Sequence, residues 1–133
     1  DSRKVLKTRI SLKDGIRQWG NVGGLITGLF TEDYGLISRS LEDGIIEPVR
    51  SLLIPGFRDM RTAALVTGAL GFGISGSGPS VYALCRGAKN AEAVSESLAA
   101  VYDAVGLPYQ IIRSGINREG VKPLPEAPSD AKV

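Results

Sequence analysis

The segment ISGSGPS, residues 74–80, limits the fold more than any other part of the chain, and we call it the glycine loop. It separates two short apolar runs, residues 70–75 and 80–85, which predict β-strands. A glycine turn between two strands is most often a hairpin. This loop alternates glycine with serine twice, however, and such a run can direct backbone N–H groups and hydroxyls into one concavity that holds a phosphate or an anionic transition state. It is no P-loop, because it lacks the GK[ST] ending.

The first half of the chain predicts helices. Apolar residues at three- and four-residue spacing favour a helix over residues 12–30, with Ser11 as its N-cap. Its five glycines are expected to allow close packing of another backbone rather than to line a ligand site. The other expected elements are helices at 31–41, from Pro48 onward and at 57–67, strands at 70–75 and 80–85, a helix at 88–105 and a strand at 109–115. This order predicts an α+β sandwich whose antiparallel sheet is covered on one face by helices.

Composition excludes several classes of function. With 133 residues, a net charge of +2 and interspersed charges, the chain is about one domain long and gives little reason to expect nucleic acid as a partner. It has no histidine, so a Ser/His or Cys/His pair and a histidine metal site are impossible. The single cysteine, Cys85, predicts a buried thiol in a reducing compartment. No apolar stretch is long enough to span a membrane, and we expect a cytoplasmic protein.

The start of the sequence suggests that the chain is part of a longer protein. It opens at Asp1, and its one methionine is Met60. We assign residues 1–121 to a single domain and expect residues 122–133, which carry three of the seven prolines, to be a flexible tail. A domain separated from its neighbour would expose an apolar face, and we therefore expect a homodimer.

Several segments resemble one enzyme family. FGISGSGPSVYALC resembles the third sequence motif of the GHMP kinases, which include galactokinases, mevalonate kinases and homoserine kinases. SRKVL, RQWGNVGGLITGLF, IIEPVRSLLIPGF and GINREGVK look like pieces of the C-terminal half of homoserine kinases, in the same order. The resemblance extends from Arg3 to Lys122, and the EPVR segment narrows it to the homoserine branch.

The resemblance implies a fold and an activity. The chain would be a ferredoxin-like C-terminal domain whose usual first strand lies upstream of Asp1. The complete enzyme would transfer the γ-phosphoryl group of ATP, with Mg²⁺, to L-homoserine, giving O-phospho-L-homoserine for threonine biosynthesis. ATP and Mg²⁺ would be bound mainly by an N-terminal domain, the partner of this one, because the PxxxGLGSS nucleotide loop is absent from these residues. The chain alone is therefore expected to be inactive.

The resemblance also assigns residues. Arg3 and Arg50 would hold the homoserine carboxylate, a task that suits a guanidinium fork. From the residues alone, two surface arginines would be the preferred interpretation. The loop residues Ser75, Gly76, Ser77 and Gly78 would lie beside phosphates and substrate. We expect no catalytic side chain and no metal ligand in this chain.

The sequence leaves two alternatives open. Another GHMP kinase of the mevalonate type would share the glycine loop but would not need two carboxylate-binding arginines. A ferredoxin-like domain with glycine turns can also be a non-catalytic module that binds an amino acid.

Overall fold

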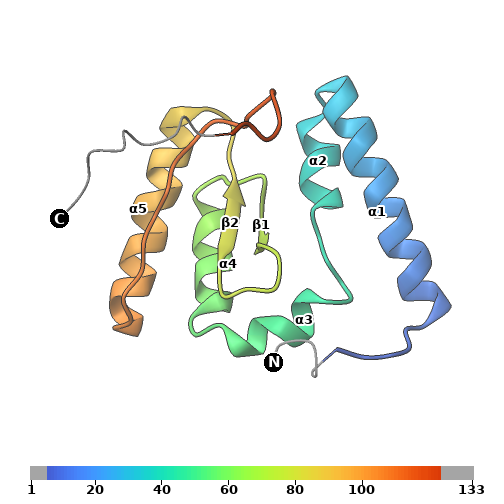
Figure 1. Cartoon of the computed structure of the whole chain (residues 1–133), viewed down its shortest axis with the longest axis horizontal. Helices are drawn as coiled ribbons and strands as arrows, with labels where there is room; N and C mark the ends of the chain where they lie inside the picture. Colours follow the sequence, from blue (N-terminus) through green and yellow to red (C-terminus); the bar gives the residue numbers. More distant parts are fainter. Residues whose placement is uncertain (1–5, 124–133) are drawn as a thin grey trace.

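The computed structural model describes residues 6–123, and within that range it has an α+β fold (Figure 1). The α+β class predicted from the sequence is confirmed. The elements, in chain order, are α1 (Leu12–Thr31), α2 (Tyr34–Ser40), α3 (Glu47–Arg50), the 3-10 helix η1 (Ser51–Leu53), α4 (Phe57–Val66), β1 (Gly71–Ile74), β2 (Val81–Leu84) and α5 (Ala88–Val105).

Helix α1 begins and ends as its sequence predicts. The Ser11 hydroxyl accepts a hydrogen bond from the Asp14 N–H at 3.1 Å, which satisfies one of the donors left free in the first turn. At the other end Glu32 takes a left-handed conformation, with φ of 54°, and its N–H bonds to the Gly28 carbonyl. The chain then turns back at once into α2, whose N-cap is Asp33.

Glycines hold α1 against α2. A Cβ atom at Gly28 would lie 2.9 Å from Ile37 Cγ1 and 3.0 Å from the Ile37 nitrogen, and one at Gly24 would lie 2.5 Å from Ser40 Oγ. Ile37 and Ser40 are buried in this contact. The expectation of close helix packing is therefore confirmed at Gly24 and Gly28, whereas a Cβ atom at Gly20 or Gly23 would meet nothing within 4 Å.

The two strands form an antiparallel hairpin in which Phe72 lies opposite Ala83 and Gly73 opposite Tyr82. Opposed residues point to the same face, so the hairpin has a Phe72 face and a Gly73 face. Phe72 is buried and lies 5.3 Å from the Phe57 ring of α4, centroid to centroid. The core on this face consists of Ile54, Phe57, Met60, Ala64, Ala69, Phe72 and Val94. Helices α4 and α5 supply most of it, so they cover one face of the hairpin.

The Gly73 face receives the other half of the chain. A Cβ atom at Gly71 would overlap Leu41, which follows α2, so the end of α2 packs directly on the backbone of β1. Arg86, just after β2, lies 4.1 Å from the centroid of the Tyr34 ring at the start of α2. These contacts place the α1–α2 pair beside the hairpin, with α1 outermost (Figure 1).

The strand predicted at 109–115 was wrong. Residues 107–116 are extended but run back along α5 without joining the sheet (Figure 1). The Tyr109 ring packs edge-on against Tyr102 at 5.3 Å, and its hydroxyl donates to Asp103 at 2.7 Å. Arg113 donates to Glu92 at 3.2 Å. The side chains of this segment bond to α5 and not to a neighbouring strand.

Residues 1–5 and 124–133 lie outside the described range, and so do Arg3 and most of the predicted tail. Within residues 6–123, none of the helices is both long enough and apolar enough to cross a membrane.

Candidate functional site

The glycine loop is the turn of the hairpin, and its ends are closed by two hydrogen bonds. Ser75 N–H donates to the Ser80 carbonyl at 2.8 Å, and Gly78 N–H donates to the Ser75 carbonyl at 3.2 Å. Gly76 and Gly78 have φ of 61° and 77°, values that glycine adopts without strain. Between the closing bonds, the N–H groups of Gly76 and Ser77 donate to no other residue in the described part of the chain. Both residues are exposed, so these two donors are available to a ligand.

Helix α3 places one charged residue at the glycine loop and another against the Gly73 face of the hairpin. Glu47 and Arg50 are three residues apart, which puts them on the same side of a helix. Arg50 Nη1 donates to the Gly76 carbonyl at 3.1 Å, so its guanidinium reaches the glycine loop. Its Nε is buried and has no hydrogen-bond partner among residues 6–123. Within the described residues, Arg50 therefore uses one donor to hold the loop and leaves its Nε without a partner.

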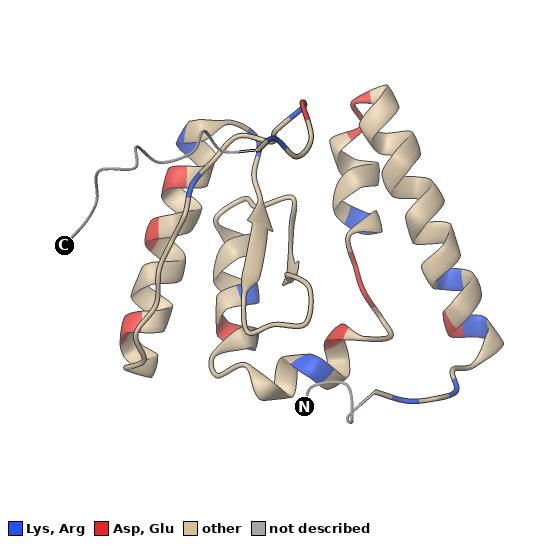
Figure 2. Ribbon diagram, viewed as in Figure 1, with Lys and Arg blue, Asp and Glu red and all other residues tan. Residues whose placement is uncertain are grey.

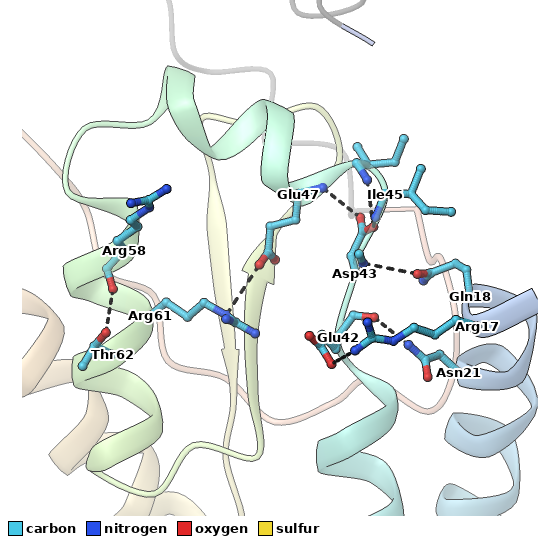
Figure 3. Close-up of polar contacts among 12 residues, drawn as sticks. Arg17, Gln18, Asn21, Glu42, Asp43, Ile45, Glu47, Arg58, Arg61 and Thr62 are labelled. Carbon is cyan, nitrogen blue, oxygen red and sulfur yellow. Dashed lines mark hydrogen bonds and ion pairs between the residues drawn. The ribbon is translucent and has the colours of Figure 1, made fainter. Parts of the chain in front are cut away.

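Glu47 lies under the hairpin instead of at the surface. Its side chain is 11% exposed, and Oε1 lies 3.5 Å from Nε of Arg61 on α4 (Figure 3). Burial raises the pKa of the Glu47 carboxyl; the Arg61 charge opposes this rise, while the Asp43 and Glu42 charges add to it. A Cβ atom at Gly73 would lie 3.2 Å from Glu47 Oε2, so the missing side chain of that glycine makes room for the carboxylate.

Asp43 fixes the start of α3. Its Oδ1 accepts from the N–H groups of Ile45 and Ile46 at 2.8 and 2.9 Å, and its Oδ2 accepts from Glu47 N–H at 3.2 Å (Figure 3). These three bonds satisfy donors that the short helix would leave free. Asp43 thus determines how α3 presents its two charged residues to the hairpin.

The segment before α3 is in turn tied to α1. Asn21 Nδ2 donates to the Glu42 carbonyl at 2.8 Å, and Arg17 forms an ion pair with the Glu42 carboxylate at 2.8 Å (Figure 3). The polar side of α1 therefore supports the turn that carries Asp43.

A cavity of about 110 Å³ lies between α3 and the Gly73 face of the hairpin. It is lined by Leu41, Asp43, Ile46, Glu47, Gly73, Ile74, Gly76 and Tyr82. Burial, followed by the Glu47 and Asp43 charges, raises the pKa of the Tyr82 hydroxyl. Of the predicted loop residues, only Gly76 lines this cavity.

The structure brings together two parts of the predicted site, the glycine loop and Arg50. Arg3, the second predicted arginine, lies outside the described residues. Glu47, Asp43 and Tyr82 were missed as parts of the site. The spacing in EPVR could have indicated Glu47, because an acid three residues before a loop-binding arginine must face the same way.

The arrangement suits an anionic ligand at the loop. Two free backbone N–H groups and an arginine lie at one end of the hairpin. Within residues 6–123, no three His, Cys, Asp or Glu side chains are grouped so as to hold a metal ion.

Comparison with known proteins identifies the family. A family model for "GHMP kinases C terminal" matches residues 25–104, which include α2 to β2 and nearly all of α5. The chain belongs to the GHMP kinases, as their C-terminal region.

Homoserine kinases are the members to which it is similar. It is 48% identical over 123 residues to "Homoserine kinase" of Chlorobium phaeovibrioides, covering 91% of this chain and 38% of the relative. It is 50% identical over 101 residues to that of Chlorobaculum tepidum, covering 76% and 31%. The crystal structure of homoserine kinase from Cytophaga hutchinsonii matches with a TM-score of 0.77 and 48% identity, over 79% of this chain and 33% of that one. The chain thus spans well under half the length of these relatives.

Proposed function

We propose that this chain is the C-terminal, substrate-side part of a homoserine kinase, which transfers the γ-phosphoryl group of ATP to the hydroxyl of L-homoserine. The product would be O-phospho-L-homoserine, a precursor of threonine, made in the cytoplasm. The similarity to proteins named homoserine kinase supports the substrate. The observation that carries the proposal is the hydrogen bond from Arg50 to the Gly76 carbonyl, because it joins a carboxylate-binding group to a phosphate-binding loop.

Arg50 would bind the carboxylate of homoserine. A guanidinium keeps its charge at all relevant pH values and can offer two parallel N–H groups to a carboxylate. Because Nη1 already holds the loop, substrate binding and loop position would be coupled through one side chain. Arg3 would be the second carboxylate-binding residue, as the family resemblance implies.

The glycine loop would stabilise the transferred phosphoryl group. Phosphoryl transfer depends mainly on positioning and on stabilising charge at the equatorial oxygens. The N–H groups of Gly76 and Ser77 are fixed donors that need no reorganisation, and no side chain at position 76 obstructs an approaching phosphate. Ser75 and Gly78 would set the shape of the turn through their closing hydrogen bonds.

The remaining parts of the active site would come from an N-terminal domain. ATP supplies the phosphoryl group, and Mg²⁺ neutralises charge on its phosphates when bound. The loop residues fit the phosphates, while the ligands of Mg²⁺ would belong mainly to the other domain. We therefore propose that the chain by itself has no kinase activity, and that the complete protein acts as a homodimer.

A chimera tests this function. The chain would replace the matching segment of the Chlorobium phaeovibrioides homoserine kinase, and ADP release would be followed with L-homoserine and with mevalonate. We expect turnover with homoserine only. Turnover with mevalonate would favour another GHMP kinase, and amino-acid binding without ADP release would favour a binding module.

The role of Arg50 is tested in the same chimera. Losing a hydrogen bond to a charged group costs roughly 1.5–3 kcal/mol, so Arg50→Ala should raise KM for homoserine roughly 10- to 150-fold. Arg113→Ala is the control, because it removes only an exposed ion pair with Glu92. An unchanged KM in Arg50→Ala would refute the proposed role.

A further inference from the structure

The short helix α3 cannot fix its own direction, although it carries Arg50. It is four residues long, and the side chain of its N-cap residue, Ile46, makes no hydrogen bond to the helix. A helix of about one turn leaves its first N–H groups without partners inside the helix and is marginally stable alone. The direction in which α3 points must therefore be set by residues outside it.

Asp43 supplies the missing cap from three residues before the N-cap. Its carboxylate accepts hydrogen bonds from the N–H groups of Ile45, Ile46 and Glu47 at 2.8, 2.9 and 3.2 Å. Three bonds to one carboxylate fix both the position and the tilt of the first turn. Figure 2 shows acidic residues on the segment that leads into α3 and a basic residue on α3 itself, the order that the helix dipole favours.

Asp43 is itself held in place by α1. Asn21 Nδ2 donates to the Glu42 carbonyl at 2.8 Å, and Gln18 Oε1 accepts from the Gly44 N–H at 3.4 Å (Figure 3). These two bonds hold the backbone on both sides of Asp43. The cap is thus fixed to a helix of 20 residues, which gives α3 a firm reference.

The other end of α3 meets the glycine loop. Arg50 lies in the last turn of α3, and its Nη1 donates to the Gly76 carbonyl. The bond length of 3.1 Å lies close to the upper limit of about 3.2 Å for a good N–H···O bond. A small displacement of α3 is therefore enough to break it.

We propose that Asp43 is a positioning residue for phosphoryl transfer, because it sets the direction of α3 and so places Arg50 against the Gly76 carbonyl. The effect on homoserine rests on the proposed function, whereas the link from Asp43 to the loop does not depend on the substrate. Asp43 acts only through Arg50 in this proposal. Its removal should therefore have no further effect once Arg50 is absent.

The link to the loop is tested by two-dimensional NMR on the 133-residue chain. The backbone amide resonances of Gly76 and Ser77 should move in Asp43→Ala, toward their positions in Arg50→Ala, and the double variant should show no further movement. Asp43→Asn removes the charge but keeps an oxygen that can cap the helix, so the same resonances should move far less. Loop resonances that stay in place in Asp43→Ala, or that move equally in Asp43→Asn, would overturn the proposal.

Asp33→Ala is the matched control. Asp33 is also an aspartate that caps a helix, since its Oδ1 accepts from the Leu36 N–H at 2.8 Å at the start of α2. That start lies at the end of the hairpin opposite to the glycine loop, because the neighbouring Tyr34 contacts Arg86, which follows β2 (Figure 1). Asp33→Ala should therefore lose a comparable cap and leave the loop resonances in place. If it moved them as strongly as Asp43→Ala, the effect would be one of general stability and the proposal would fail.

A double-mutant cycle in the chimera tests the effect on the reaction. Loss of a helix cap corresponds to roughly 2- to 30-fold in an equilibrium constant, so Asp43→Ala should raise KM for L-homoserine within that range. Arg50→Ala and the double variant should have the same KM within about twofold. A purely structural role would lower the amount of folded enzyme, and hence kcat, without changing KM.

Two kinetic results would contradict the role of Asp43. They are an unchanged KM in Asp43→Ala, and a KM that rises by the same factor with and without Arg50. A chimera that releases no ADP with homoserine would refute the proposed function instead, and the loop resonances would then decide whether Asp43 positions Arg50.

Discussion

The close contact between α1 and α2 can be tested with two glycine substitutions that should act in opposite directions. Gly28 and Gly20 lie in the same helix and have the same intrinsic preference. At Gly28 a Cβ atom would lie 3.0 Å from the Ile37 nitrogen and 3.2 Å from the Asp33 carbonyl oxygen. These are backbone atoms, so α2 itself would have to move. At Gly20 a Cβ atom would meet nothing within 4 Å.

The magnitudes follow from two opposing effects. Replacing glycine by alanine inside a helix stabilises it by up to about 1 kcal/mol. Forcing an extra carbon into a packed contact costs roughly 1–3 kcal/mol. Gly20→Ala should therefore raise the free energy of unfolding by about 0.5–1 kcal/mol. Gly28→Ala should lower it by about 1–2 kcal/mol, because the overlap outweighs the gain in helix preference.

Urea unfolding followed by circular dichroism at 222 nm measures both changes. With a denaturant slope of roughly 1–3 kcal/mol per molar, the two midpoints should differ by about 1 M. Gly24→Ala should fall between them, because its overlap at 2.5 Å is with the Ser40 hydroxyl, which can rotate away. Equal stabilisation in Gly20→Ala and Gly28→Ala would refute close packing of α1 on α2.

Two further predictions concern α3 and the glycine loop. The pKa of the Glu47 carboxyl is raised above its ordinary value of 4.5, so the native state retains a proton that the unfolded state releases. The free energy of unfolding should therefore fall as pH rises from 4.5 through the native pKa. Glu47→Gln should remove this part of the pH dependence, which urea unfolding of the original chain and the variant between pH 4.5 and 8 would measure. If their free energies of unfolding differ by the same amount at every pH, the prediction is wrong. Gly76 has φ of 61°, a conformation that is strained for alanine and less so for asparagine. Gly76→Ala should therefore lower the free energy of unfolding by about 1 kcal/mol, and Gly76→Asn by less. Equal losses in the two variants would argue against backbone strain at this position.

The sequence predicted most elements because their local signals agree with their packing. Ser11 caps α1 and Gly106 ends α5 in a left-handed conformation, so local rules placed both boundaries. Residues 109–115 show where such rules fail. A short apolar segment predicts a strand but cannot supply the neighbouring strand, and here the bonds of Tyr109 and Arg113 to α5 decide the position.

The face that a helix buries could not be predicted from its periodicity alone. The apolar spacing of α1 predicted a helix, yet the buried residues of this helix are Gly15 and Gly28. Burial of α1 depends on Ile37 and Ser40, which the sequence places ten or more residues away from most of the helix. The glycines of α1 predicted a close approach of another backbone, but the sequence could not show that α2 is the helix that approaches.

The sequence identified only part of the candidate site. The glycine loop could be identified because its composition is unusual, and Arg50 because of the family resemblance. Tyr82 could not, because it reaches the site only through the strand register that pairs it with Gly73. The EPVR spacing could indicate Glu47, but not the turn that Asp43 fixes before α3. One buried carboxylate and one loop-binding guanidinium therefore share a single helical turn. Any change that moves α3 should alter the Arg50–Gly76 bond and the Glu47–Arg61 pair together.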